Sequence, residues 1–185
     1  MITKEDAVAL LSQYIKNERS LYHCYAAEAV MRTLARRLGQ DEEKWGIAGL
    51  LHDLDLEMID GNLAVHTHET AKILAEIGVD PEIIDAIKMH NEDAWGVKRN
   101  TVFHHALAAG ETITGMIAAT ALVYPDKKLA SVKTKSVTKR MKEKAFAASV
   151  NRDTIMECEK LGIPLAEFAE ISLGAMKEIS DRLGL

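Results

Sequence analysis

A histidine and an aspartate stand side by side at the end of an apolar stretch, as His52 and Asp53 in GLLHDLDLE. A carboxylate that is buried without a partner is strongly destabilising. A divalent cation removes that penalty, and imidazole and carboxylate are both good ligands for such ions. We therefore expect His52 and Asp53 to bind a metal ion.

His23 is the next candidate ligand. It begins HCYAAEAVMRTLARRL, an alanine-rich helical pattern in which Ala26 and Ala27, three and four positions later, leave space beside the ring. Adjacent helical residues point about 100° apart, so His52 and Asp53 can share an ion only if it lies off the flank of their helix. A second helix must then approach the same ion, and His23 is a reasonable donor from that helix.

These residues resemble the motif of the HD superfamily of metal-dependent phosphohydrolases, which is a histidine, a later His-Asp pair and a distal aspartate on a further helix. His23 matches the first histidine, and His52-Asp53 in AGLLHDLD match the pair. The resemblance implies Glu111, in HHALAAGETITGMI, as the distal ligand, where many relatives carry aspartate. The common extension of the pair to Ile-Gly is absent, because Leu54-Asp55 stand there.

Some branches of this superfamily hold two metal ions through additional histidines between the pair and the distal acid. His68 in HTHETAKIL and His90 in AIKMHNE occur in that order. The resemblance implies that each is a metal ligand or a substrate contact. Asn91 stands where some dinuclear relatives have a second consecutive histidine, so both one ion and two ions stay open. The other three histidines are expected to have structural roles (His66, His104 and His105).

Imidazole and carboxylate donors without a thiolate suit Mn, Fe, Co, Ni, Zn or Mg. A bound ion of this kind lowers the pKa of water and polarises a phosphoryl oxygen. The expected activity is hydrolysis of a phosphoester or phosphoanhydride in a small phosphorylated substrate, with a nucleotide or dinucleotide as the first choice. Two alternatives stay open: a non-catalytic nucleotide-binding or sensory module, which the departures at Glu111 and Asn91 favour, and a di-iron oxygenase of the HD type.

Further polar residues are candidates for contact with the substrate. Asp55 and Glu57 follow the pair and are either general acids or solvated acids at a helix end. Arg19 lies one helical turn before the first histidine and is expected to contact the substrate phosphate. Lys133 and Lys135 belong to the basic stretch KKLASVKTKSVTKRMKEK, which either folds over the site and binds the anionic substrate or is simply solvated.

The elements that position these residues are expected to be helices. Apolar residues recur every three or four positions, and the three prolines stand where helices would start or stop. We expect an all-α fold, a single compact HD-type helical bundle over 1–185, with an HD core over 18–125 and a C-terminal helical extension over 126–185 packed on it. Helices are predicted over 3–17, 20–38, 41–56, 67–77, 81–91, 101–123, 134–149, 151–161 and 164–183, with loops at 57–65 and 92–100.

The composition argues against several other classes of protein. Hydrophobic residues make up 48% and charged residues 28%, as in ordinary soluble proteins, and the net charge of -5 favours neither specific nucleic-acid binding nor an anionic membrane. No GxxxxGKS or GxGxxG stretch occurs, which argues against a conventional nucleotide-binding loop.

The cysteines and the N-terminal stretch predict where the protein works. Cys24 and Cys158 are expected to be reduced thiols, and charges interrupt the apolar residues of the N-terminal stretch. We therefore expect a cytoplasmic protein. The eight methionines and the apolar face of 164–183 could cover either the core or a partner subunit, so a homo-oligomer stays open.

Overall fold

The structure is a computed structural model that describes residues 2–185, and within those residues it contains α-helices, short 3₁₀ helices and no strand. The all-α prediction is confirmed. The α-helices are α1 (Lys4–Tyr14), α2 (Glu18–Leu38), α3 (Glu42–Leu51), α4 (His68–Glu76), α5 (Pro81–His90), α6 (Val102–Leu122), α7 (Thr134–Arg140), α8 (Arg152–Met156), α9 (Leu165–Glu178) and α10 (Ser180–Leu183). The 3₁₀ helices are η1 (Glu92–Ala94), η2 (Leu129–Ser131) and η3 (Glu157–Leu161).

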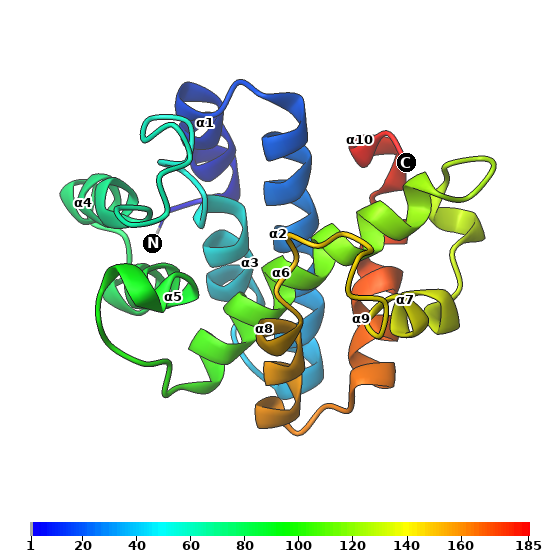
Figure 1. The fold of residues 1–185 in the computed structure, drawn as a ribbon. Helices are drawn as coiled ribbons and strands as arrows, with labels where there is room; N and C mark the ends of the chain where they lie inside the picture. Colours follow the sequence, from blue (N-terminus) through cyan, green and yellow to red (C-terminus); the bar gives the residue numbers. More distant parts are fainter. Residues whose placement is uncertain (1) are drawn as a thin grey trace.

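Two long helices form the centre of the molecule. α2 and α6, each of 21 residues, cross one another, and α3 lies along α2 (Figure 1). α2 begins where the Asn17 side chain accepts two backbone N–H groups of the first turn. It ends at Gly39, whose φ of +65° is the left-handed conformation common after the last helical turn.

α2 and α3 approach each other most closely at Gly49. A Cβ at this position would lie 2.7 Å from the carbonyl oxygen of Ala27 and 2.8 Å from its carbonyl carbon, so a glycine is needed for the two backbones to pack together. Gly49 precedes His52 by three residues. The glycine contact therefore determines how far the end of α3 lies from α2.

Several helices are shorter than the sequence predicts, among them α1, which ends at Tyr14 rather than at residue 17, and α8, which ends at Met156 where η3 follows. α3 ends at Leu51 rather than at residue 56, α7 ends at Arg140 rather than at residue 149, and the last helix is divided at Ile179 into α9 and α10. Hydrogen bonds from the nearby Arg152 side chain replace helical hydrogen bonds after α7. The Arg152 guanidinium donates to four carbonyl oxygens of this segment (Glu143, Phe146, Ala147 and Val150).

The C-terminal helices pack on the central pair. α9 contacts α2, α6 and α7, and its side chains Phe168, Leu173 and Met176 are buried in the same apolar core as the earlier helices. α10 contacts α2 and lies near the C-terminal half of α6 (Figure 1). Of the helices in the part of the chain that the structure describes, none combines the length and the apolar character needed to cross a membrane.

Candidate metal centre

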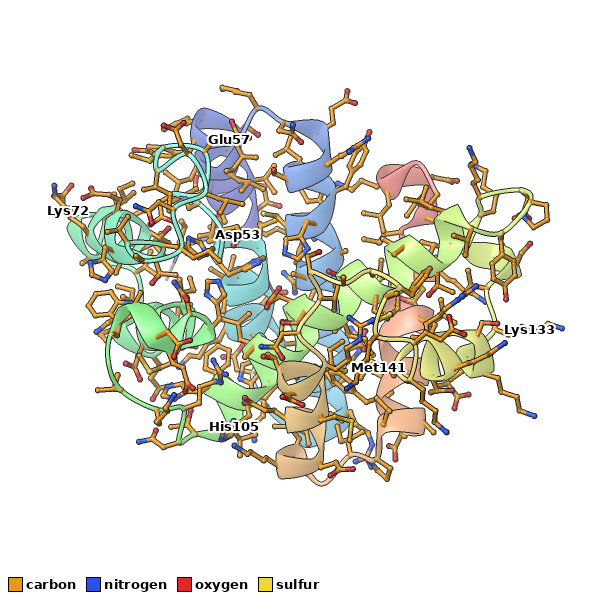
Figure 2. All side chains as sticks on the ribbon, in the orientation of Figure 1. Asp53, Glu57, Lys72, His105, Lys133 and Met141 are labelled. Atoms are coloured by element: carbon orange, nitrogen blue, oxygen red, sulfur yellow. The ribbon has the colours of Figure 1, made fainter. Side chains whose placement is uncertain are left out.

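The ends of two helices bring His23 and the His-Asp pair together. His23 lies in the second turn of α2, His52 follows the last residue of α3, and Asp53 comes next. The Nε2 atoms of His23 and His52 are 3.0 Å apart. The Asp53 carboxylate lies 3.5 Å from Nε2 of His23 through Oδ2 and 3.4 Å from Nε2 of His52 through Oδ1. Asp53 lies near the middle of the molecule, at the end of α3 (Figure 2).

Asp53 also belongs to a second group of ligand atoms. Its Oδ1 lies 3.0 Å from Nε2 of His66 and 3.6 Å from Nε2 of His90. The Nε2 atoms of His66 and His90 are themselves 3.0 Å apart. His90 is the last residue of α5, and His66 lies in the turns that precede α4. Two sets of possible metal ligands therefore share one carboxylate, with His23 and His52 on one side and His66 and His90 on the other.

Each of these four imidazoles is oriented by a hydrogen-bond acceptor on its other ring nitrogen, Nδ1. The acceptors are the Gly49 carbonyl oxygen for His52 (2.8 Å), the Ile87 carbonyl oxygen for His90 (2.6 Å), Asp55 Oδ1 for His66 (2.7 Å) and the Thr114 hydroxyl for His23 (2.9 Å). The Thr114 hydroxyl donates to the Glu111 carbonyl oxygen at 2.6 Å, so it accepts from His23. Since Nδ1 donates in each ring, Nε2 is the atom left to bind a metal.

The separations between these atoms fit a metal ion. Two unprotonated Nε2 atoms 3.0 Å apart repel one another unless a cation lies between them. Two ligands with bonds of about 2.1 Å to one ion are about 3.0 Å apart at a right angle and about 3.4 Å apart at a tetrahedral angle. The contacts in both groups lie between 3.0 and 3.6 Å. The residues of each group therefore fit a divalent ion.

Burial and charge shift the pKa values of this cluster in opposite directions. Burial lowers the pKa of His52 to about 4, so its ring stays neutral. Burial also opposes charge on Asp53, but the imidazoles around it hold the pKa of that carboxyl well below its usual value. Burial opposes protonation of His66, yet Asp53 and Asp55 raise its pKa to about 9. A proton on His66 and a divalent ion therefore compete for the same nitrogen.

Glu111 faces the first group of ligands from α6. Its Oε2 lies 3.5 Å from Nε2 of His23, and its Oε1 accepts from the Thr112 hydroxyl. Burial alone would raise the pKa of Glu111, but the hydrogen bond and charge of His23 lower it. The carboxylate is thus placed beside His23, on the helix from which the resemblance expects the distal acid.

His68 lies outside the cluster, and His66 takes the place expected for it. The His68 ring lies over Trp95, with centroids 4.2 Å apart, and its Nε2 bonds to the Ala94 carbonyl oxygen at 3.1 Å. The stretch HTH offers two histidines in succession, and the backbone between them decides which one faces Asp53. Thr67 has a φ of +81°, a left-handed conformation that its residue type does not predict.

The three basic residues expected to contact the substrate phosphate do not lie together at the cluster. Lys133 projects outward at the right-hand edge of the molecule, away from Asp53 (Figure 2), and Lys135 is exposed on the following helix, α7. The basic stretch therefore does not fold over the cluster. Arg19 is exposed in the first turn of α2 and lines an apolar cavity together with His23.

The two acids after the pair are not solvated helix-end residues. Asp55 is fully buried, and besides its bond to His66 it accepts the backbone N–H of Thr70 at 3.1 Å. Glu57 accepts the backbone N–H groups of Lys16 and Asn17 between α1 and α2. These bonds occupy both carboxylates, so neither is placed to act as the general acid. Asp55 orients His66, a role that the sequence reasoning missed. Its position two residues after Asp53 was the one signal in the sequence that could have suggested this role.

A cavity of about 390 Å³, here called the mouth, opens onto the cluster. It is lined by exposed atoms of both candidate groups, from His23, Asp53, His66 and His90, and by residues that follow α7, among them Val150 and Asn151. The Asn91 side chain does not act as a ligand, because it donates to the carbonyl oxygens of Leu63 and His66 at 2.8 and 3.2 Å. The mouth therefore gives a small molecule access to both ligand groups.

The fold and cluster define an all-α protein with a histidine and carboxylate centre suited to divalent metal ions. The model of the HD domain family matches residues 20–121, more than half of the chain, and the protein belongs to that family. The match spans all the residues of the cluster and ends before α7. HD domains bind divalent metals, and the family generally comprises hydrolases. No curated protein and no solved structure matched the chain.

Proposed function

We propose that the protein is a metal-dependent phosphohydrolase that cleaves a phosphoester or phosphoanhydride bond in a small phosphorylated substrate. One observation carries the proposal: four imidazoles turn Nε2 toward the shared carboxylate of Asp53, and each is held in that orientation by an acceptor on Nδ1. Such an arrangement is typical of ligands prepared for metal ions rather than of histidines that serve packing alone.

The proposed ligands are arranged in two groups that share Asp53. The first consists of His23 and His52, with Glu111 beside them, and the second of His66 and His90. Ions bound there would activate water and polarise a phosphoryl oxygen. The protein's own contribution is orientation and charge: Asp53 stays ionised, and Asp55 directs the His66 ring toward it.

The substrate class follows from the family and from the mouth. A nucleotide or dinucleotide is the first choice that the resemblance implies, and the mouth, of about 390 Å³, is within the range of about 300–1,000 Å³ usual for small-molecule sites. Arg19 is the proposed cationic contact, since it lines the cavity beside His23, whereas Lys133 and Lys135 line neither cavity at the cluster. The substrate screen therefore includes nucleotides, dinucleotides and simple phosphomonoesters.

The test combines metal analysis with turnover. The purified full chain is assayed for bound metal and then for phosphate release with Mn, Co, Ni, Fe, Zn or Mg. His52→Ala and Asp53→Ala are each expected to lower turnover by at least about a hundredfold, because each removes a ligand. His68→Gln is the matched control, a histidine near the cluster that takes no part in it, and it should retain activity. Wild-type turnover in His52→Ala would reject the proposal.

A di-iron oxygenase is a second candidate, because two ligand groups sharing one carboxylate also suit a pair of irons. The metal content of the protein and the product of its reaction distinguish the two functions. Two irons per chain with oxygen consumption, and no phosphate release under any metal, would favour the oxygenase. Tight retention of a nucleotide without turnover would instead favour a binding module.

A further inference from the structure

A second cavity, of about 560 Å³, adjoins the metal centre on the side away from His66 and His90. We call it the apolar cavity. It lies between α2, α6 and the C-terminal helices, and α10 runs beside α2 at this place (Figure 1). The large apolar side chains on its walls come from all three regions (Tyr22, Leu122, Met176, Leu183 and Leu185).

The apolar cavity adjoins the proposed reaction site. His23 and Gly115 line both this cavity and the mouth. Gly115 has no side chain to separate them, and a Cβ there would already lie 3.3 Å from Cγ2 of Val150. A molecule whose phosphate lies at the cluster would have to extend past His23 to reach the apolar cavity.

The lining specifies the chemistry of that extension. Among its residues, all within the described chain, Arg19 is the one with a permanently charged side chain, and it lies at the exposed start of α2. Thr114 already accepts from His23 and donates to a backbone carbonyl, which leaves the Tyr22 hydroxyl as the other uncharged polar group of the lining. No free side-chain amide or carboxylate lines the cavity to recognise a base edge or a sugar hydroxyl. Apolar surface is what it can bury.

We propose that the apolar cavity binds the non-phosphate part of the substrate, and that the preferred substrates are phosphate esters of a predominantly apolar alcohol rather than the nucleotides that the resemblance alone implies. The inference rests on the proposed phosphohydrolase function. It also assigns a role to the C-terminal helices, since Met176, Leu183 and Leu185 lie outside the residues that the family model matches. The HD region supplies the ligands, and the later helices supply a wall that selects the alcohol.

The test uses a series of simple esters with the full chain loaded with Mn²⁺. Methyl, butyl and hexyl phosphate differ in apolar length, while glycerol phosphate is a polar compound close in size to butyl phosphate. Each methylene that enters the cavity is expected to raise kcat/KM by up to about fourfold. Glycerol phosphate should be hydrolysed no better than methyl phosphate.

Two neighbouring substitutions provide a matched pair. Leu122 and Val123 are similarly exposed, at 53% and 55%, and follow each other at the end of α6, but only Leu122 lines the cavity. Leu122→Glu should lower the ratio of kcat/KM for hexyl phosphate to that for methyl phosphate by at least about tenfold. Val123→Glu should leave this ratio unchanged. Because both side chains are exposed, neither variant is expected to unfold.

The outcomes distinguish the two proposals. Hydrolysis that does not depend on chain length, or equal ratios in the two variants, would overturn the cavity inference and leave the phosphohydrolase proposal intact. If the wild type hydrolyses no ester, the proposed function fails, and calorimetric titration with hexyl phosphate decides about the cavity. The cavity inference would be supported if hexyl phosphate binds the wild type, and if Leu122→Glu weakens this binding while Val123→Glu does not. It would be overturned if hexyl phosphate does not bind the wild type.

Discussion

Asp55→Asn tests whether the cluster contains two separable metal sites. Asp55 accepts from Nδ1 of His66 at 2.7 Å and from the backbone N–H of Thr70 at 3.1 Å, and it is fully buried. An asparagine amide cannot serve both partners. Either its NH₂ group faces the Thr70 N–H, or it faces His66 Nδ1 and forces the ring proton onto Nε2, where it blocks metal binding.

The magnitude follows from the bond that is lost. A hydrogen bond to a charged group contributes about 1.5–3 kcal/mol, which corresponds to roughly 10- to 100-fold in affinity. The same range is found when the partner of a metal-ligating histidine is removed. We expect the loss to fall on the group of His66 and His90, while the group of His23 and His52, oriented by other acceptors, keeps its affinity.

The assay is equilibrium dialysis against a range of Mn²⁺ concentrations, with metal per chain measured by mass spectrometry. Wild type should bind two ions, whereas Asp55→Asn should bind one at concentrations that saturate the wild type. Asp60→Asn is the control, since Asp60 is exposed at a φ of +49°, which asparagine tolerates. Identical binding curves for Asp55→Asn and the wild type would refute the reasoning, as would loss of both ions together from a folded variant.

Three further predictions follow from particular contacts. Because the pKa of His66 is raised to about 9, metal binding at pH 7 should release a proton from this ring. Titration calorimetry in buffers of different ionisation enthalpy should detect the released proton. The affinity for metal should rise from pH 7 to 9. Glu157 pairs with the Arg99 guanidinium at 2.8 Å. Burial alone would raise the pKa of Glu157, but Arg99 and His105 lower it, so the stabilisation that the carboxylate provides is present above its unfolded pKa and is lost as the pH falls through its folded pKa. Glu157→Gln should thus destabilise by about 2–4 kcal/mol at pH 7 in urea unfolding, and a difference that persists undiminished at pH 3 would contradict this. Gly49→Ala should lower the free energy of unfolding by about 1–3 kcal/mol and weaken metal binding, because the new Cβ meets the backbone of Ala27. Gly174→Ala is the control and should not destabilise the protein, since nothing lies within 4 Å of a Cβ there. Equal thermal midpoints for the two variants would contradict this prediction.

The general plan of the fold could be predicted from the sequence because it depends on local patterns. Apolar spacing and the positions of the prolines indicated the helices, although α2 begins at Glu18, after the Asn17 cap, rather than at the predicted residue 20. The helix ends were less predictable where side chains compete with the backbone N–H groups for the carbonyl oxygens. Arg152 holds the segment after α7 in turns through its carbonyl oxygens, a contact that no local pattern of the segment itself indicates.

The His-Asp pair, His23 and Glu111 could be selected from the sequence, because residue type and order along the chain are enough to match a motif. Which further histidine reaches Asp53 was decided by the tertiary structure. His66 rather than His68 faces the carboxylate because the backbone turns at Thr67 and Asp55 holds the ring. Only the packing of α9 and α10 against α2 and α6 creates the apolar cavity, since its walls are far apart in sequence and become neighbours when the helices bury their apolar faces together.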